Sequence, residues 1–305
     1  MGAVVLADTR GMDRETWLQE RRKGIGSSDA AAVAGLNPWR SPLAVYLDKA
    51  GEYPDDPEPE DGPMYWGTAL EDIVAAEFAK RTGFKIRRRN AILQSNEHPF
   101  MIADLDREVR EPDGTWSVLE VKTGSAWTAE QWAEDAIPDQ YAIQVHHQLI
   151  VTGRDHGWIA VLLGGQRFEK RRVDFDPEVA ERLIELEAAF WQRVQDRNPP
   201  PPEGTDSDED ALFTLYPQAN GNEIDLPPDA ATLIDDYRVA AMDEKDSKTR
   251  KEEAKQRLCA LLGEAEVGLL GGQPVVRWKN AHRDAYMVQA SDYRQFSLVK
   301  QKGAR

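Results

Sequence analysis

The chain has 305 residues, 41% hydrophobic and 30% charged, which is enough apolar material for one large core and a second, smaller one. Its single cysteine, Cys259, excludes an internal disulfide and any four-cysteine iron–sulfur or zinc site. The formal net charge of −16 argues against a protein that coats nucleic acid through bulk electrostatics, although a metal cluster and a local basic groove can hold DNA in an acidic body.

The sequence shows no targeting or membrane-spanning segment. The residues near the start lack the charged flank and apolar run of a signal peptide. No stretch approaches the roughly 20 apolar residues that span a bilayer. We therefore expect a cytoplasmic protein without a membrane partner.

A glycine-containing break between two helices is the first functional signal. Residues 17–22 predict a short helix, and residues 24–29 (Gly-Ile-Gly-Ser-Ser-Asp) break it before a second helix begins. Ser28 or Asp29 is the expected N-cap, and backbone N–H groups at such a helix start bind phosphate. Arg21, one turn before the glycines, adds a bidentate guanidinium for the same phosphate. The alternative interpretation is an ordinary capping turn.

An acidic, proline-rich segment over residues 51–63 predicts an exposed loop, and a helix is expected over 67–82. The buried stripe of that helix is Leu70, Val74 and Phe78. Glu71 lies at the margin of the stripe, where a carboxylate either leans toward a site or points into water. A strand over 85–93 follows.

A β-hairpin is predicted next. Residues 101–110 form one expected strand, residues 111–114 (Glu-Pro-Asp-Gly) a tight turn, and residues 116–122 the returning strand. If the hairpin is symmetric about residue 113, Asp106 lies opposite Glu120. Cross-strand partners have Cβ atoms about 5 Å apart.

This pairing predicts a metal site. Two carboxylates so close repel each other unless a cation lies between them, and hard oxygen ligands suit Mg²⁺ or Mn²⁺. Because side chains alternate along a strand, Lys122 shares the face of Glu120, while Val121 points into the core. A lysine there can orient a water or balance the charge of a phosphate. The pattern is that of metal-assisted phosphodiester hydrolysis, and the alternative is a solvated strand face.

A helix opening near Pro138 carries a polar face formed by Tyr141, Gln144 and Gln148. The amide of Gln144 can contact a scissile strand or position the lysine, and surface exposure is the simpler explanation. Strands over 157–163 and 168–175 complete a mixed α/β unit with a final helix over 177–197.

Proline and acidic residues then suggest a domain boundary. We expect a nuclease domain over residues 1–198, a stiff linker over 199–210, and a C-terminal region over 211–305. That region predicts one or two helices over 228–262 and a hairpin over 266–279 that packs on the helix end. It contains no catalytic constellation, and its expected uses are oligomerisation, partner docking or an added wall for DNA.

Taken in order, these motifs resemble the YqaJ-like viral recombinase family of the lambda exonuclease type, over roughly residues 14–195. The residues that carry the resemblance are Arg21, Gly24 to Asp29, Trp66-Gly67, Glu71, Asp106, Glu120-Val121-Lys122, Tyr141 and Gln144. The resemblance implies an α/β fold with the restriction-endonuclease-like core of PD-(D/E)xK nucleases, in which helices flank a central mixed β-sheet. A smaller, mostly helical C-terminal region with a β-hairpin follows that core.

The resemblance also implies an enzyme, a Mg²⁺-dependent deoxyribonuclease with Mn²⁺ as an alternative ion. It assigns the metal to Asp106, Glu120, the Val121 carbonyl and Glu71. Lys122 becomes the group that positions water, and Gln144 an active-site contact. Arg21 and Ser28 hold the 5′ phosphate of the DNA.

The implied function is 5′-to-3′ digestion of linear double-stranded DNA, which leaves 3′ single strands for phage-type recombination. The expected partners are double-stranded DNA ends, a single-strand annealing protein and further copies of the chain, in a bacterial or phage-infected cell. Two alternatives stay open, an endonuclease with the same core and a non-catalytic module that binds DNA ends or protein. Asp104 shares the predicted strand face of Asp106, so the local pattern leaves open which carboxylate binds metal, and the resemblance favours Asp106.

Overall fold

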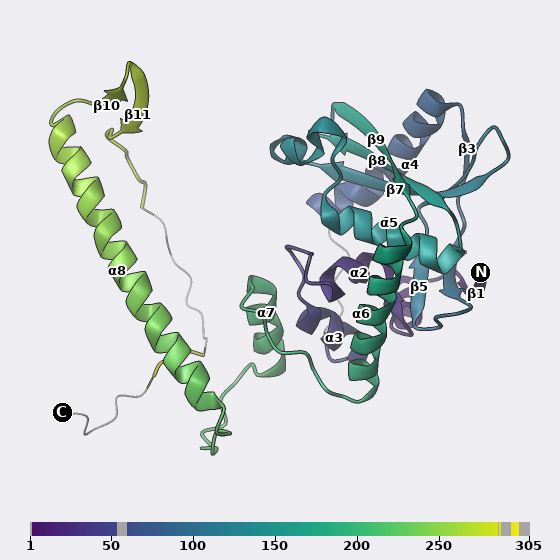
Figure 1. The fold of residues 1–305 in the computed structure, drawn as a ribbon, viewed down its shortest axis with the longest axis horizontal. Helices are drawn as coiled ribbons and strands as arrows, with labels where there is room; N and C mark the ends of the chain where they lie inside the picture. The colour runs from purple at the N-terminus through teal and green to yellow at the C-terminus, as the bar shows by residue number, and fades with distance from the viewer. Residues whose placement is uncertain (1, 54–59, 286, 288–293, 299–305) are drawn as a thin grey trace. The chain divides into compact units, whose positions relative to one another are not determined.

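The structure is a computed structural model, and it describes residues 2–53, 60–285, 287 and 294–298. The chain forms two compact units, Met1–Pro217 and Gln218–Arg305. The first is a mixed α/β unit, and the second consists of a long helix and a hairpin (Figure 1). Residues 54–59 of the predicted acidic loop lie outside the described residues.

Unit 1 alternates short strands with helices. Its strands are β1 (Ala3–Asp8), β2 (Ile25–Gly26), β3 (Lys85–Arg87), β4 (Ala91–Ser95), β5 (Met101–Asp104), β6 (Arg107–Arg110), β7 (Trp116–Gly124), β8 (His156–Leu163) and β9 (Arg167–Asp174). Its helices are α1 (Arg14–Arg21), α2 (Ser27–Val33), α3 (Pro42–Ala50), α4 (Pro63–Thr82), the 3₁₀ helix η1 (Ala126–Asp135), α5 (Asp139–Thr152), α6 (Pro177–Gln195) and α7 (Asp206–Leu215).

Two sheets organise the described part of unit 1. The larger has the strand order β3-β6-β7-β8-β9, in which only β7 and β8 run parallel. The smaller has the order β1-β4-β5-β2, in which β2 and β5 run parallel. The mixed α/β architecture predicted from the sequence is therefore confirmed.

Helices α4 and α5 cover opposite faces of the larger sheet. Val74 and Phe78 of α4 pack on Leu119 and Val121. The opposite face of β7 and β8 packs against α5, where a Cβ on Gly157 would lie only 2.8 Å from a methyl group of Val145. Because side chains alternate along β7, Glu120 faces α5 rather than α4.

Two predicted strands are each divided between the sheets. The expected strand over 85–93 is β3 and β4, with Asn90 between them at φ +47°, and the expected strand over 101–110 is β5 and β6. In both places the chain crosses from one sheet to the other within a few residues. Alternating hydrophobicity looks the same on either side of such a crossing, so the pattern predicts one strand. Asp106 lies at the second crossing.

Unit 1 extends beyond the linker predicted over residues 199–210. Helix α7 begins at Asp206, and the backbone N–H of Ser41 donates to the Ser207 hydroxyl at 3.0 Å. Ala211 lies in the same apolar cluster as Leu43 of α3. The division between the units falls after Pro217, because α7 buries an apolar face on α3 despite its acidic first turn.

In unit 2, residues 230–262 form one continuous helix, α8 (Ala230–Leu262), followed by the strands β10 (Val267–Leu270) and β11 (Gln273–Arg277). Gly268 lies against Leu262, so the hairpin packs on the end of the helix as expected. No helix in the described residues is long and apolar enough to cross a membrane.

Candidate active site

A cavity of about 430 Å³ is lined by residues of both sheets of unit 1, by the start of α2 and by Glu71 in the middle of α4. It is lined by all seven side chains to which the sequence analysis gave a role, Arg21, Ser28, Glu71, Asp106, Glu120, Lys122 and Gln144. Val121 is not among its lining residues, because its side chain packs against α4. Arg21 and Gln144, the first and last residues of a 124-residue stretch, thus line the same site.

Asp106 lies beside Glu120. Arg107 pairs with Leu119 in the register that the symmetric hairpin predicts, and Asp106 and Glu120 are the next residues beyond this pair. The Oδ2 atom of Asp106 accepts a hydrogen bond from the Val121 N–H at 2.7 Å. Burial and the charge of Glu120 raise the pKa of Asp106 well above its usual value, and the Lys122 charge and the Val121 hydrogen bond offset this only in part. A cation between the two carboxylates would relieve this cost.

Glu120 is held by three nitrogen donors. Its Oε1 atom accepts from Lys122 Nζ and from Gln144 Nε2, both at 2.6 Å. Its Oε2 atom accepts from Gln148 Nε2, also at 2.6 Å. Surface exposure of Gln144 is wrong as an explanation, since Gln144 is 9% exposed and Gln148 fully buried. Sequence reasoning missed the contact of Gln148, although its spacing of four residues from Gln144 indicates the same helix face.

Lys122 carries a proton under ordinary conditions. Burial alone would lower its pKa, but the charges of Glu120 and Asp106 outweigh burial and raise it above the usual lysine value. Its ammonium also lies 5.3 Å from the centre of the Tyr141 ring. Lys122 can therefore donate hydrogen bonds at neutral and mildly alkaline pH.

Glu71 reaches the cavity from α4 but is engaged by a cation of the protein itself. Arg107, whose side chain is 5% exposed, pairs with Glu71 and with Asp72, and also donates to the carbonyl oxygen of Asp106. No motif in the sequence pointed to Arg107, because an isolated arginine on a strand carries no spacing signal.

The donor atoms suit a hard divalent cation at the carboxylate pair. Asp106 and Glu120 present oxygen ligands of the kind that Mg²⁺ and Mn²⁺ prefer, and the Glu120 carboxylate is buried. The pKa of Asp106 is raised by desolvation and by the charge of Glu120. Within the described residues, no three His, Cys, Asp or Glu side chains already form a metal-binding group. Glu71 contacts Arg107 through its Oε1 atom, so a metal at the carboxylate pair would share this carboxylate with Arg107.

The other side of the cavity carries the predicted phosphate-binding residues. Arg21 Nη2 donates to the Ser28 hydroxyl at 2.7 Å, and the guanidinium lies 4.6 Å from the centre of the Trp17 ring. The Trp17 indole N–H donates to Asp104 Oδ2 at 3.0 Å. Trp17 was missed as a site residue, although it lies one helical turn before Arg21.

The cap of α2 differs from the prediction. The helix begins at Ser27 with Gly26 as its N-cap, so neither Ser28 nor Asp29 has that position. Asp29 instead lies in the first turn and accepts a hydrogen bond from the Gly26 N–H at 3.0 Å. This bond lets the helix start earlier than a search for capping residues indicates.

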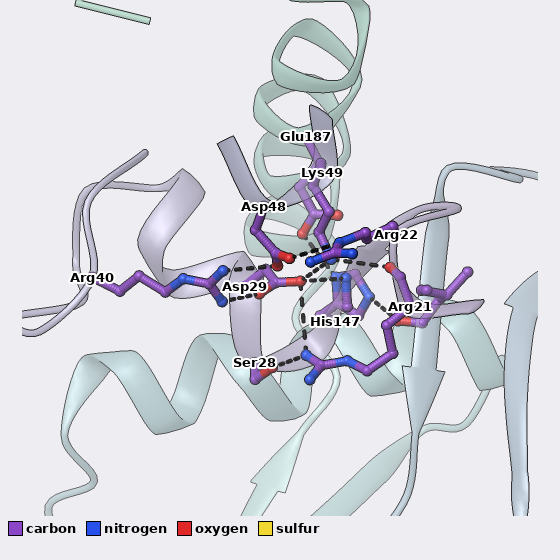
Figure 2. A network of polar contacts seen from close by, with 11 residues as sticks. Arg21, Arg22, Ser28, Asp29, Arg40, Asp48, Lys49, His147 and Glu187 are labelled. Atoms are coloured by element: carbon purple, nitrogen blue, oxygen red, sulfur yellow. Dashed lines mark hydrogen bonds and ion pairs between the residues drawn. The ribbon is translucent and has the colours of Figure 1, made fainter. Parts of the chain in front are cut away.

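Asp29 is the centre of a buried charge network (Figure 2). Lys49 Nζ lies 2.7 Å from its Oδ2 atom, Arg40 Nη1 lies 2.8 Å from Oδ1, and Arg21 Nη2 lies 3.9 Å away. Lys49 also donates to the Arg21 carbonyl oxygen at 3.0 Å. Burial would raise the pKa of Asp29, but Lys49, Arg40 and Arg21 outweigh it and hold that pKa far below its usual range.

Asp29→Asn is therefore expected to destabilise the protein by about 3–5 kcal/mol, because it leaves the buried ammonium of Lys49 without its ion-pair partner. The native pKa is lowered, so the stabilisation from Asp29 is present above the unfolded-state value of about 3.9 and is lost as the pH falls further. Urea unfolding at pH 7 measures the effect. The double variant with Lys49→Met should recover most of it, and Asp235→Asn on the exposed face of α8 is the control.

A destabilisation by Asp29→Asn of less than about 1 kcal/mol would contradict this account of the network.

A second buried pair fixes α5. His147 Nδ1 lies 2.8 Å from a Glu187 carboxylate oxygen, and Nε2 lies 2.9 Å from the carbonyl oxygen of Ile102. Burial would lower the pKa of His147, but Glu187 and the carbonyl raise it, so the doubly protonated ring suits both acceptors. The pair links α5 to α6 and β5, and it holds the helix that carries Gln144.

The sequence is similar to one family and to a bacterial relative. Residues 16–155 match the YqaJ-like viral recombinase domain. The chain is 35% identical over 281 residues to the uncharacterized protein YqaJ of Bacillus subtilis (strain 168), an alignment that covers 91% of this chain and 86% of the relative.

The structure is similar to a solved alkaline exonuclease. LHK-Exo from Laribacter hongkongensis superposes with a TM-score of 0.51 at 18% identity, covering 60% of this chain and 94% of that chain. Its complex with dAMP gives the same TM-score and coverage at 19% identity.

Proposed function

The chain belongs to the YqaJ-like viral recombinase family, and from this premise we propose that it is a metal-dependent exonuclease that digests linear double-stranded DNA from its 5′ ends. The fold agrees with the expectation from the sequence, since the restriction-endonuclease-like core is the fold shared with LHK-Exo. The proposal extends to a product with 3′ single strands, a single-strand annealing partner and a homo-oligomer in the cytoplasm of a bacterial or phage-infected cell.

One observation carries the proposal, namely that the cavity has two chemically different sides. On one side, Asp106 and Glu120 offer oxygen ligands beside the protonated Lys122. On the other, Arg21 and Ser28 form a hydrogen-bonded pair that suits the oxygens of a phosphate. A nuclease that acts at DNA ends needs both features within one site.

Asp106, Glu120 and the Val121 carbonyl are the groups that would hold Mg²⁺ or Mn²⁺, with Glu71 as a further ligand. When bound, such an ion activates water and stabilises the charge that develops on a scissile phosphodiester. The residues around it have separate tasks in the proposal. Gln144 supports Glu120 by its hydrogen bond.

Lys122 orients the attacking water by donating a hydrogen bond, as its raised pKa allows. Arg21 neutralises the terminal 5′ phosphate, and the Ser28 hydroxyl donates to one of its oxygens. These two residues contact no base edge in this scheme, so the enzyme selects an end rather than a sequence.

End-labelled linear duplex in Mg²⁺ tests the activity. A 5′ label should be released at once as a mononucleotide, whereas a 3′ label should stay on long strands until late. Covalently closed circular DNA of the same sequence should remain intact, because it offers no terminal phosphate.

Cutting of the circle would instead favour an endonuclease with the same core. Absence of cleavage of every substrate in both Mg²⁺ and Mn²⁺ would favour the non-catalytic binding module.

Removal of Arg21 tests the recognition of the end. The wild type should digest a 5′-phosphorylated duplex about tenfold or more faster than a 5′-hydroxyl duplex at limiting DNA, since hydrogen bonds to charged groups contribute about 1.5–3 kcal/mol. Arg21→Ala should bring the two rates close together. Arg182→Ala, on the exposed face of α6, is the matched control and should keep the wild-type ratio. Equal rates in the wild type would disprove this role of Arg21.

A further inference from the structure

Asp104 is a second carboxylate in the cavity, two residues before Asp106. It ends strand β5 and pairs across the smaller sheet with Ile92, which also lines the cavity. Asp106 lies beyond the end of this strand, where the chain crosses to β6. The two carboxylates therefore belong to different local structures, although the sequence predicts one continuous strand face.

The contacts of Asp104 lead toward the phosphate-binding side. Its Oδ2 atom accepts the indole N–H of Trp17 at 3.0 Å. The ring of Trp17 has the Arg21 guanidinium 4.6 Å from its centre, and Arg21 in turn donates to Ser28 at 2.7 Å. By contrast, Asp106 accepts from the backbone of β7, next to Glu120.

We propose that Asp104 is a positioning residue for the 5′-phosphate site, which acts by holding Trp17 under the Arg21 guanidinium, and that it is not a metal ligand. The inference rests on the proposed function of Arg21 and deepens it. An indole attracts a guanidinium only when the ring face stays beneath the charge. The hydrogen bond from the indole N–H to Asp104 gives the ring a second point of attachment besides its bond to α1.

The guanidinium is then held on several sides. Trp17 supports one of them, Ser28 accepts from Nη2, and the Asp29 carboxylate lies 3.9 Å from the same nitrogen. A phosphate that arrives in the cavity meets a charge whose position is already set. Such preorganisation lowers the entropic cost of binding, so its loss should appear in KM more than in kcat.

Two substitutions of Asp104 separate positioning from metal binding. Asp104→Asn keeps an oxygen that accepts the indole N–H but loses the negative charge that a metal needs. Asp104→Leu has a similar size and accepts no hydrogen bond. Two quantities are measured: the affinity of the DNA-free protein for Mn²⁺ by calorimetry, and the ratio of kcat/KM for 5′-phosphorylated over 5′-hydroxyl duplex.

If Asp104 is a positioning residue, Asp104→Asn should leave both quantities within about twofold of wild type, because the side-chain oxygen that accepts the indole N–H remains. Asp104→Leu should leave the Mn²⁺ affinity unchanged and lower the phosphate preference about tenfold, mainly through KM. Trp17→Leu should lower the preference to the same extent. The double variant should show little further loss, since both changes break one connection.

A loss of Mn²⁺ affinity in Asp104→Asn of about tenfold or more would overturn the inference and make Asp104 a metal ligand. An unchanged phosphate preference in both Asp104→Leu and Trp17→Leu would also overturn it. If Asp104→Leu does not fold, Asp104→Asn and Trp17→Leu decide by the same two measurements. Trp278→Leu, in the hairpin of unit 2, is the matched control for loss of a tryptophan.

The same measurements distinguish a failure of the proposed role of Arg21 from a failure of the proposed role of Asp104. A wild type without any phosphate preference would remove the role of Arg21 and this inference together. A wild type that has the preference, with variants that retain it, would remove only the role of Asp104.

Discussion

Asp106→Asn is expected to lower the rate of DNA hydrolysis at least about 10³-fold while leaving the DNA-free protein no less stable than wild type. The loss of activity follows because an amide is a poor ligand for Mg²⁺ and cannot replace the carboxylate beside Glu120. The stability is retained because the substitution removes a negative charge that destabilises the metal-free protein. Without a cation, burial and Glu120 make the ionised form of Asp106 costly, as its raised pKa shows.

The sign of the pH dependence follows from that raised pKa. A group whose native pKa lies above its unfolded value contributes stability at low pH, and this contribution is lost as the pH rises through the native pKa. At pH 8 the wild type should therefore carry a cost at Asp106 that the asparagine variant avoids. The Val121 N–H can still donate to the amide oxygen, so the local fold should be kept.

Thermal unfolding at pH 8 with and without Mn²⁺, together with the hydrolysis assay, measures these effects. The wild type should gain stability from Mn²⁺, and Asp106→Asn should gain much less. Asp174→Asn at the exposed end of β9 is the control, with wild-type values in both assays. An Asp106→Asn protein that hydrolyses DNA at a rate close to wild type would rule out Asp106 as a ligand.

Lys122→Met is expected to lower kcat about 10²–10⁴-fold and to change KM for DNA little. The methionine keeps the volume of the side chain but removes the ammonium that orients water. Because the pKa of Lys122 lies above the usual lysine value, its proton is in place throughout the neutral and mildly alkaline range. The wild-type rate should therefore not fall in that range through deprotonation of Lys122.

Single-turnover kinetics with excess enzyme isolate the chemical step for this variant. Lys170→Met is a suitable control, since that exposed lysine lies on β9, two strands away in the same sheet. A Lys122→Met enzyme with a wild-type single-turnover rate in Mg²⁺ would refute the assigned chemistry. A large change in KM with an unchanged kcat would instead indicate that Lys122 binds DNA.

The two variants also differ in their effects on Glu120. Asp106→Asn removes the repulsion that Glu120 experiences and leaves its three nitrogen donors in place. Lys122→Met removes the only charged donor among them. We therefore expect Lys122→Met to lower stability, because a buried carboxylate then depends on two neutral amides.

Local features of the site could be predicted from the sequence because they lie within one element or one tight turn. The turn at residues 111–114 determines the hairpin register, so the position of Asp106 relative to Glu120 followed from counting residues. Alternation along β7 likewise assigned Glu120 and Lys122 to one face and Val121 to the other. Site residues that lie close together on one strand can therefore be predicted from their spacing in the sequence.

The partners of single residues could not be predicted. Nothing in the sequence links Glu71 to Arg107 or Trp17 to Asp104, since each pair joins elements that meet only after the two sheets have packed. The same holds for Asp29, which looked like a helix cap and is a buried counter-ion for Lys49 and Arg40. Contacts of this kind depend on which apolar faces cover each other.

By itself, the sequence determined the residue types, the α/β class and the faces of individual strands and helices, because backbone periodicity sets the direction of each side chain within an element. The tertiary structure alone decided that the chain crosses between sheets at Asp106, that Glu71 forms an ion pair with Arg107, and that α7 belongs to unit 1. Those outcomes depend on the packing of distant elements, which local spacing does not encode.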